Sequence, residues 1–373
     1  MKALITGGAG FIGSHIVDAL LERGHEVRIL DNLPPKVHPT GKPDYLPDEL
    51  DCMVGDVTDA SAMRKALEGI DVVFHQAAHQ GMLPDFSAFF RTNTVGLALL
   101  FETIVKNRYP TQKVIVASSQ AVYGEGRYVC PSCEDVVYPP PRPLEQLMRG
   151  EWRIRCPKCL TPLCVQPTDE AHANPHTPYA MSKYAQDLIA LNLGRQHRIP
   201  VVVLRYSITQ GPRQSFFNAY SGILRIFTTR LLNGRPPVLY EDGEMQRDYI
   251  HVDDVVRANL TVLENEASNY QVYNVGTGIP TTQRQYAATI ACKLGVSIAP
   301  VTPGEFRFGD ARHIVSDSNK LRELGWKPMK TLNNIVSDYI AWIERQKGVR
   351  DYFTEAERIM KEVGTIRTAI NQL

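Results

Sequence analysis

The stretch Thr-Gly-Gly-Ala-Gly-Phe-Ile-Gly, residues 6–13, decides the fold. It follows a short apolar run with strand character, residues 1–5, and it precedes the helical pattern of Ile16, Ala19 and Leu20. Glycines at such a turn permit a tight bend, let the backbone approach a pyrophosphate, and let the next helix pack closely with its N-terminus toward the anion. This order of strand, turn and helix predicts a dinucleotide site in preference to a plain turn, formed by Gly7, Gly10, Phe11, Ile12 and Gly13.

A second strand, residues 26–30, ends at Asp31. A carboxylate at this position binds a ribose 2′-hydroxyl and repels a 2′-phosphate, which favours NAD over NADP. The plainer alternative is a carboxylate that merely ends a strand in a turn. We expect Asp31 and its neighbour Asn32 to lie beside the adenosine of the cofactor.

Strands and helices continue to alternate along the chain. Alternation of this kind predicts an α/β fold of the Rossmann type, a doubly wound parallel sheet with helices on both faces. The expected strands are 51–54, 72–75, 114–117 and 201–206, and the expected helices are 61–67, 93–105 and 179–196.

The alternation of strands and helices is interrupted at two places, which suggests the domain organisation. We expect a dinucleotide-binding domain at 1–205, interrupted by a Pro- and Cys-rich insertion at 126–167. A smaller substrate lobe is expected at 206–345, with a segment near 249–276 that returns to the first domain. Residues 346–373 are charged and have a helical pattern, so they form a predicted helical tail.

Composition excludes several classes of protein. The 373 residues are 43% hydrophobic and 22% charged, as in ordinary globular chains. A formal charge of +1 provides no field for a nucleic-acid backbone, so nucleic acid is not an expected partner. No apolar run reaches the roughly 18 residues that span a bilayer, and the glycine turn leaves no room for a signal peptide. We therefore expect a cytoplasmic protein without a membrane partner.

A candidate catalytic group lies in Tyr179-Ala-Met-Ser-Lys183, at the start of an expected helix. Residues at positions i and i+4 share a helix face, so the phenol and the ammonium can point into one site. A nearby ammonium stabilises a phenolate, which predicts a lowered pKa for Tyr179 and a role as general base. Ser119 ends a preceding strand, where ligands of parallel sheets bind, and it can hold the same substrate oxygen. Taken alone, each residue also suits a surface or strand-end position.

Together, these motifs resemble the extended short-chain dehydrogenases that act on nucleotide sugars. The resemblance covers residues 1 to about 340 and rests on the glycine loop, Ser118-Ser-Gln-Ala-Val-Tyr-Gly124, Tyr179-Ala-Met-Ser-Lys183, Gly211-Pro-Arg213, Gln246-Arg-Asp-Tyr-Ile-His-Val-Asp-Asp254 and Tyr273-Asn-Val-Gly276. It implies bound NAD, a nucleoside-diphosphate-sugar substrate, and a homodimer formed by the helices at 93–105 and 179–196.

The resemblance also assigns residues. It implies that Ser119, Tyr179 and Lys183 are catalytic. It places Asp56, Val57, Gln76, Ala77, Ala78 and Asn93, with Tyr179 and Lys183, around the cofactor. It places His79, Gln80, Ser119, Gln120, Arg213, Asn218, Arg247 and Arg312 around the sugar nucleotide; surface ion pairs are the alternative for the three arginines.

Two departures narrow the expected chemistry. Dehydratases of the family carry an Asp-Glu pair after the catalytic hydroxyl, and related decarboxylases carry a glutamate near this place, whereas this chain has Gln120 and Ala121. What remains is oxidation and reduction at one sugar carbon, as in the 4-epimerases. The sequence therefore predicts an NAD-dependent epimerase that acts on carbon 4 of a nucleotide-linked hexose through a 4-keto intermediate. The alternatives are a reductase or dehydratase of the same superfamily, or a non-catalytic dinucleotide sensor.

Four of the seven cysteines form two C-x-x-C pairs within the insertion. In a chain without a secretion signal, such pairs predict a closed zinc site more readily than disulfides, with Cys130, Cys133, Cys156 and Cys159 as ligands. Four thiolates leave no open position on the ion, so the zinc is expected to be structural. The insertion follows the Ser119 strand, which suggests a lid on the sugar pocket; a neutral insertion or an oligomer contact is the alternative. This feature resembles a dTDP-L-rhamnose 4-epimerase-like branch of the superfamily.

Overall fold

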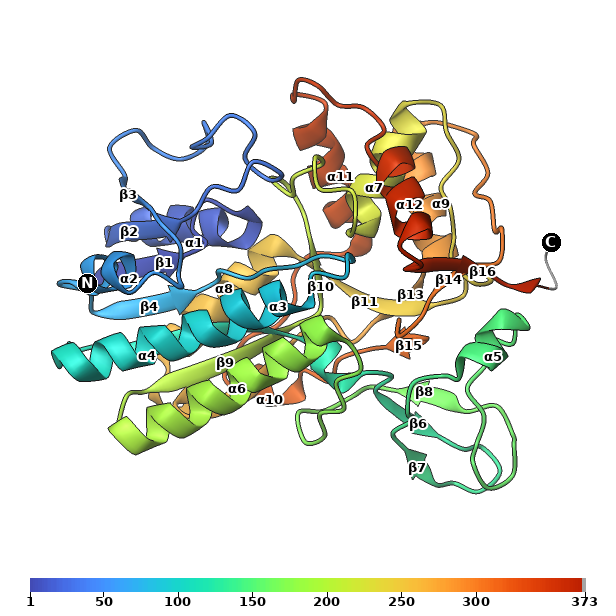
Figure 1. The fold of residues 1–373 in the computed structure, drawn as a ribbon, viewed down its shortest axis with the longest axis horizontal. Helices are drawn as coiled ribbons and strands as arrows, with labels where there is room; N and C mark the ends of the chain where they lie inside the picture. The colour runs from blue at the N-terminus through green and yellow to red at the C-terminus, as the bar shows by residue number, and fades with distance from the viewer. Residues whose placement is uncertain (371–373) are drawn as a thin grey trace.

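The computed structural model describes residues 1–370 and has a seven-stranded sheet at its centre (Figure 1). All neighbouring strands of this sheet pair in parallel, which confirms the predicted α/β class. Buried β-branched residues dominate strands such as 201–206, as expected for strands covered on both faces. The order is β12-β9-β5-β4-β1-β2-β3, with β1 (Lys2–Thr6), β2 (Glu26–Asp31), β3 (Asp51–Val54), β4 (Val72–His75), β5 (Lys113–Ser119), β9 (Val201–Tyr206) and β12 (Gln271–Val275).

Helices cover both faces of this sheet. On one face lie α1 (Phe11–Leu21) and α8 (Val252–Glu264), which contribute Ile16, Val17 and Val255 to the core. On the other lie α2 (Ala60–Leu67), α4 (Gly96–Asn107) and α6 (Pro178–His197). A short helix, α3 (Phe86–Phe89), and a π-helical turn, Phe90–Val95, lead into α4, so the helix predicted from residue 93 has an irregular start.

The run Phe86–Asn107 is long and apolar enough to cross a membrane by length and composition, with a mean hydropathy of 1.2. This run was not identified from the sequence. Its residues Leu97, Leu100, Phe101 and Ile104 are buried in the core against the sheet. The run is therefore a helix of the protein core, and buried core helices can be as long and as apolar as membrane-spanning ones.

The second lobe combines helices with short strands. A small sheet joins β10 (Ile208–Gln210), β11 (Gln246–His251), β13 (Pro280–Thr282) and β15 (His313–Ile314). Its helices are α7 (Ile223–Leu232), α9 (Gln283–Leu294), α11 (Leu332–Ile343) and α12 (Phe353–Glu362). The chain returns to the first domain with α8 and β12 and again near α10 (Asn319–Arg322), where Leu321 and Trp326 enter the core. This second return was not predicted.

The tail at 346–373 was predicted to be helical, but its described part also contains a strand. After α12, β16 (Ile366–Thr368) pairs antiparallel with β14 (Glu305–Arg307). The insertion contains β6 (Arg127–Val129), β7 (Val136–Val137), β8 (Cys164–Gln166) and α5 (Leu144–Met148), and it projects beside β14 and β16 at one end of the molecule (Figure 1).

Candidate functional site

The glycine loop lies between β1 and α1, and a Cβ on two of its glycines would run into neighbouring backbone atoms. Gly7 has φ +70°, and an added Cβ would lie 2.8 Å from the Ala77 backbone. A Cβ on Gly13 would lie 2.2 Å from the Gly7 carbonyl oxygen. The helix start therefore packs directly on the turn, which leaves a backbone cradle of the kind that receives a pyrophosphate.

Acidic side chains flank this cradle. The Asp31 carboxylate ends β2 and accepts hydrogen bonds from the backbone N–H groups of Ala9 (3.1 Å) and Leu33 (2.9 Å). Asp56 accepts from Thr58 and, at 3.0 Å, from Asn32. Burial by itself would raise the pKa of Asp56, but these hydrogen bonds outweigh it and lower that pKa. Both carboxylates are thus fixed in place beside the cradle.

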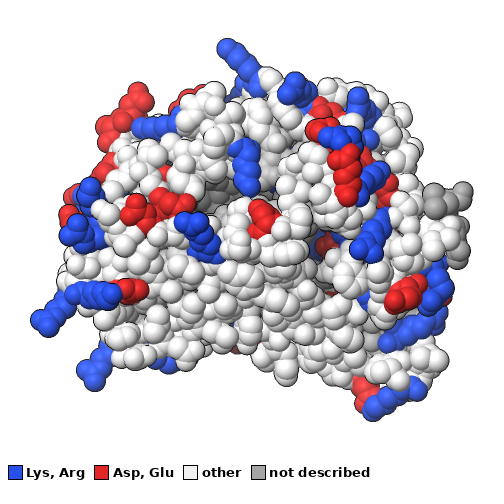
Figure 2. Space-filling view, viewed as in Figure 1, with Lys and Arg blue, Asp and Glu red and all other residues white. Residues whose placement is uncertain are grey.

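One cavity of about 1500 Å³ runs from the cradle, past the carboxyl ends of the strands, to the second lobe. It is hollowed between the two lobes in the space-filling view (Figure 2). This volume exceeds the upper end, about 1000 Å³, of a pocket for one small ligand, so it has room for a dinucleotide and a second molecule. Of the residues predicted for the cofactor, those that line the cavity are Gly7, Gly10, Phe11, Ile12, Gly13, Asp31, Asn32, Asp56, Val57, Gln76, Ala77, Ala78, Tyr179 and Lys183.

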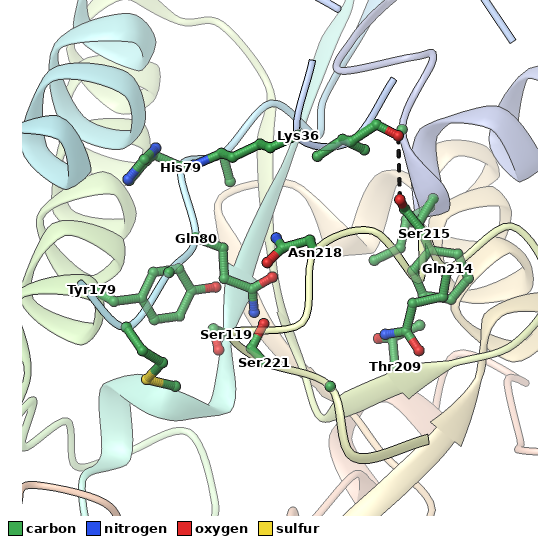
Figure 3. A pocket seen from close by; sticks show the side chains of 18 of the residues that line it. Lys36, His79, Gln80, Ser119, Tyr179, Thr209, Gln214, Ser215, Asn218 and Ser221 are labelled. Carbon is green, nitrogen blue, oxygen red and sulfur yellow. Dashed lines mark hydrogen bonds between the residues drawn. The ribbon is translucent and has the colours of Figure 1, made fainter. Parts of the chain in front are cut away.

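Ser119, Tyr179 and Lys183 meet in the middle of this cavity. Ser119 ends β5, and Tyr179 stands in the first turn of α6, which Thr177 caps by accepting the Ala180 N–H. The Tyr179 hydroxyl points toward the space where Ser119 and Gln80 project (Figure 3). Tyr179 and Ser119 are sixty positions apart in the sequence, yet both line this cavity, and the Ser119 hydroxyl is near enough to act on the pKa of the phenol.

The predicted effect of Lys183 on Tyr179 is wrong in this geometry. Burial raises the pKa of Tyr179, and only the neighbouring Ser119 hydroxyl opposes this rise. The Lys183 ammonium donates instead to Ala117 O (2.7 Å) and Gln186 Oε1 (2.8 Å). Burial lowers the pKa of Lys183 to about 8, while Asp187 acts in the opposite direction. The phenol is therefore protonated at neutral pH here, and Lys183 is still mostly charged.

Most residues predicted for the sugar nucleotide also line the cavity: His79, Gln80, Ser119, Gln120, Arg213, Asn218 and Arg247. Asn218 comes from the second lobe and faces Gln80 across the cavity (Figure 3). Arg213 forms an ion pair with Asp18 (2.7 Å) and lies over the ring of Tyr45. Arg247 donates to the carbonyl groups of Ala311 and Arg312, so much of the hydrogen-bonding capacity of its guanidinium is taken up by the protein backbone.

Two predicted residues do not line the cavity. Asn93 is fully buried; it accepts from the His79 N–H (2.8 Å) and donates to His79 O and Ser182 Oγ, so it supports the wall behind His79 and does not contact a cofactor directly. Arg312 is 4% exposed and donates to Glu241 and Asp242, which makes it part of a buried ion network. The alternative of an ion pair is therefore right for Arg312 in its partners but wrong in its location, because the pair with Glu241 is buried and not at the surface.

Several cavity residues were missed in the sequence. They come from the loop after Asp31 and from segments of the second lobe that have no recognisable motif. Ser215 of the second lobe connects to this loop, because its Oγ donates a hydrogen bond to Val37 O at 3.2 Å (Figure 3). The Pro, Gly and Lys content of residues 33–45 was the one feature of the sequence that could have indicated a loop at the cavity. The missed residues include Lys36, Val37, Thr209, Gln214, Ser215, Ser221, Arg307, Thr365 and Arg367.

The four cysteines of the insertion form a compact group. Their sulfur atoms all lie within 4.8 Å of one another, and none of the four is in a disulfide. Cys130 and Cys159 bring their sulfurs to 3.5 Å, and the Cys133 N–H points at Cys130 Sγ. Four sulfurs bound to one zinc ion at about 2.3 Å would be roughly 3.8 Å apart, which this group nearly matches. No residue of 126–167, a fully described segment, lines the cavity in this structure, so the predicted lid has no contact with the cavity here.

Comparison with known proteins adds a family match. Residues 3–146 and 160–276 match the model of the NAD dependent epimerase/dehydratase family. The chain is 32% identical over 352 residues to a dTDP-L-rhamnose 4-epimerase of Burkholderia thailandensis, covering 92% of this chain and 95% of that protein. It is 30% identical to a putative UDP-glucose 4-epimerase of Methanocaldococcus jannaschii, covering 91% and 98%.

Solved structures show the same likeness. The UDP-glucose 4-epimerase of Thermotoga maritima with UDP-glucose has a TM-score of 0.76 and 30% identity, covering 92% of this chain and 99% of that one. The UDP-glucose 4-epimerase of Thermus thermophilus in complex with NAD has a TM-score of 0.72 and 30% identity, with the same coverage. Both the sequence and the three-dimensional likeness thus extend over nearly the whole chain.

Proposed function

Because the chain belongs to the NAD-dependent epimerase/dehydratase family, we propose that it is an NAD-dependent nucleotide-sugar epimerase that inverts carbon 4 of the hexose. The observation that carries this choice is the wall beside Ser119 and Tyr179, where Gln120 and Ala121 line the cavity. The carboxylates among its described lining residues are Asp31, Asp44, Asp56 and Asp310. The first three lie toward the cofactor end, and Asp310 is paired with Arg307, so none is placed for water elimination beside Ser119.

The residues at the glycine loop fit NAD. The crowded positions of Gly7 and Gly13 leave a cradle that any Cβ would fill, and Asp31 suits a ribose with a free 2′-hydroxyl. NAD, when bound there, supplies the acceptor and donor of a hydride. Asp31, Asp56 and the cradle backbone would hold it, and Asn93 steadies the wall that carries His79.

Tyr179, Ser119 and Lys183 handle the proton. Tyr179 Oη takes the proton of the substrate 4-hydroxyl while Ser119 Oγ holds the substrate oxygen. Tyr179 later returns the proton to the same oxygen, once carbon 4 has the opposite configuration. Lys183 contributes a buried positive charge fixed by Ala117 O and Gln186. Because burial raises the pKa of Tyr179, little of its base form is present at neutral pH, and that form becomes more abundant as pH increases.

The substrate we propose is a dTDP-linked hexose. The support is the identity to the dTDP-L-rhamnose 4-epimerase of Burkholderia thailandensis over 95% of its length. His79, Gln80, Gln120, Asn218, Arg213 and Arg247 are the residues that we assign to the sugar nucleotide.

We also propose that Cys130, Cys133, Cys156 and Cys159 hold a structural zinc ion. The chemistry of the donor set supports it, because four sulfurs gathered within 4.8 Å suit a tetrahedral soft-ligand site. The ion would close the insertion and hold its two turns together.

A homodimer through α4 and α6 completes the proposal. The outer faces of these helices and of the preceding turn expose Phe90, Val95, Met181 and Leu188, of which Val95 is 52% exposed. The surface over α4 and α6 carries few charged side chains (Figure 2). An uncharged face with several large apolar groups is typical of an interface. A cytoplasmic location stays a prediction.

The test is incubation of the purified protein with dTDP-, UDP-, GDP- and CDP-linked hexoses, without added cofactor, followed by chromatography and mass spectrometry. A new peak of unchanged mass is the expected result, and its nucleotide identifies the substrate. Loss of water or of carbon dioxide contradicts the assignment of Gln120 and Ala121. Turnover only with added cofactor indicates a reductase, and tight dinucleotide binding with no turnover indicates a sensor.

A further inference from the structure

Arg142 belongs to the cysteine-rich insertion, yet its side chain is buried against the second lobe. It is 5% exposed and forms a bidentate pair with Glu241, with N–O distances of 3.0 and 2.8 Å. Its Nε donates to Glu125 Oε1 at 3.2 Å, and Nη2 donates to Asp310 O at 2.9 Å. One side chain of the insertion thus joins three segments that are far apart in the sequence.

These contacts fix the backbone of residues 310–312. Arg142 holds the carbonyl group of Asp310, and Glu125 accepts the Arg312 N–H at 2.5 Å. From the other side, Arg247 donates to the carbonyl groups of Ala311 and Arg312. Glu241 accepts from both Arg142 and Arg312, so the same carboxylate couples the two guanidinium groups.

The segment held in this way is a wall of the substrate end of the cavity. Arg307, Phe308, Gly309, Asp310 and Ala311 all line it. Asp310 accepts two hydrogen bonds from Arg307, at 2.9 and 2.6 Å, so the position of the Arg307 guanidinium depends on the position of Asp310. A shift of the 310–312 backbone would therefore move a charged group that lines the cavity.

The insertion, in turn, fixes Arg142. The residue lies between the two cysteine pairs, and its Nη1 donates to Trp152 O at 3.1 Å. Trp152 packs on Phe306 with ring centroids 5.9 Å apart, next to Leu147 and Ala369. A loop without a core of its own is ordered by such a small cluster together with the closed cysteine group.

We infer that Arg142 is a positioning residue for nucleotide-sugar binding, through which the cysteine-rich insertion controls substrate affinity without contacting the substrate. This inference rests on the proposed function. It replaces the predicted lid by a support behind the wall. Loss of Arg142 also leaves the buried Glu125 and Glu241 without their main partner, which favours displacement of the segment.

The experiment compares Arg142→Gln with Arg153→Gln, a change of an exposed arginine in the same insertion. Binding of dTDP, UDP, GDP, CDP and NAD is measured by calorimetry, and KM and kcat are measured on the sugar nucleotide that is turned over. We expect Arg142→Gln to weaken nucleotide binding and raise KM by about tenfold, the effect of losing one ordered contact, with kcat and NAD affinity nearly unchanged. Arg153→Gln should behave like the unaltered protein.

Arg142→Lys keeps the charge but loses the bidentate geometry, and it provides a second measurement where the glutamine variant does not fold. We expect an intermediate KM and faster amide hydrogen exchange in residues 305–314, with unchanged exchange in residues 7–14. Unchanged KM and exchange in a folded variant would overturn the inference, as would an equal loss of NAD and nucleotide affinity. An unaltered protein that binds NAD but none of dTDP, UDP, GDP and CDP would refute the proposed function and this inference with it.

Discussion

Replacement of Gly13 by alanine tests the assignment of the glycine loop. The added Cβ would lie 2.2 Å from Gly7 O and 2.9 Å from Gly8 Cα, whereas ordinary contacts begin near 3.4 Å. The start of α1 must then retreat by roughly 1 Å, a displacement of the kind that costs up to about 10²-fold in a well-oriented site. We therefore expect NAD affinity to fall by about 10- to 100-fold.

Stability should change much less than cofactor affinity. Alanine inside a helix is favoured over glycine by about 0.5–1 kcal/mol, and this gain offsets part of an overpacking cost of about 1–3 kcal/mol. Calorimetric titration with NAD and thermal unfolding separate the two effects. Gly10→Ala is the graded control, because its Cβ would meet Gly7 O at 3.2 Å with φ −74°, and it should lose less affinity. A folded Gly13→Ala protein that binds NAD as tightly as the unaltered chain would refute the cradle.

Three further predictions follow from the site. Tyr179→Phe should lower kcat by about 10²- to 10⁴-fold with NAD binding retained, and a variant that keeps its kcat would remove Tyr179 from the proton path. In the unaltered enzyme, kcat/KM should still rise with pH between 6 and 8 since burial raises the pKa of Tyr179; a flat profile there contradicts its role as base. Burial and the Lys183 charge lower the pKa of His75 to about 3, so unfolded chains bind a proton that folded chains do not. The free energy of unfolding should therefore fall as pH drops below 6.5, by up to about 1.4 kcal/mol per pH unit from this group, and His75→Asn should show a shallower fall in urea titrations. Equal slopes for the two proteins would show that His75 does not contribute.

The part of the site that follows local rules could be predicted from the sequence. The glycine loop, Asp31, Ser119 and Tyr179 are fixed by turns, strand ends and a helix start, each of which has a recognisable pattern. Six of the seven strands of the parallel sheet follow from the same alternation, whereas for β12 the sequence predicted only a segment near 249–276 that returns to the first domain.

The part that depends on partners from distant segments could not be predicted. Arg312 has the residue type for a diphosphate, but Glu241 and Asp242 bind it inside the lobe. The pKa of Tyr179 depends on how deeply the phenol is buried and on where the Lys183 ammonium is directed, and helix spacing specifies neither. The strand β16 was missed because its partner β14 lies some sixty residues earlier, where no local pattern connects the two.

The strand order of the central sheet affects the growing chain on the ribosome. Six of the seven strands are complete by Tyr206, but the strand that covers β9 is made only at residues 271–275. During the synthesis of the intervening segment, the Val-Val-Val-Leu run of β9 remains an unpaired apolar edge. Nascent chains arrested in this interval should therefore aggregate or recruit chaperones more than chains released after Val275.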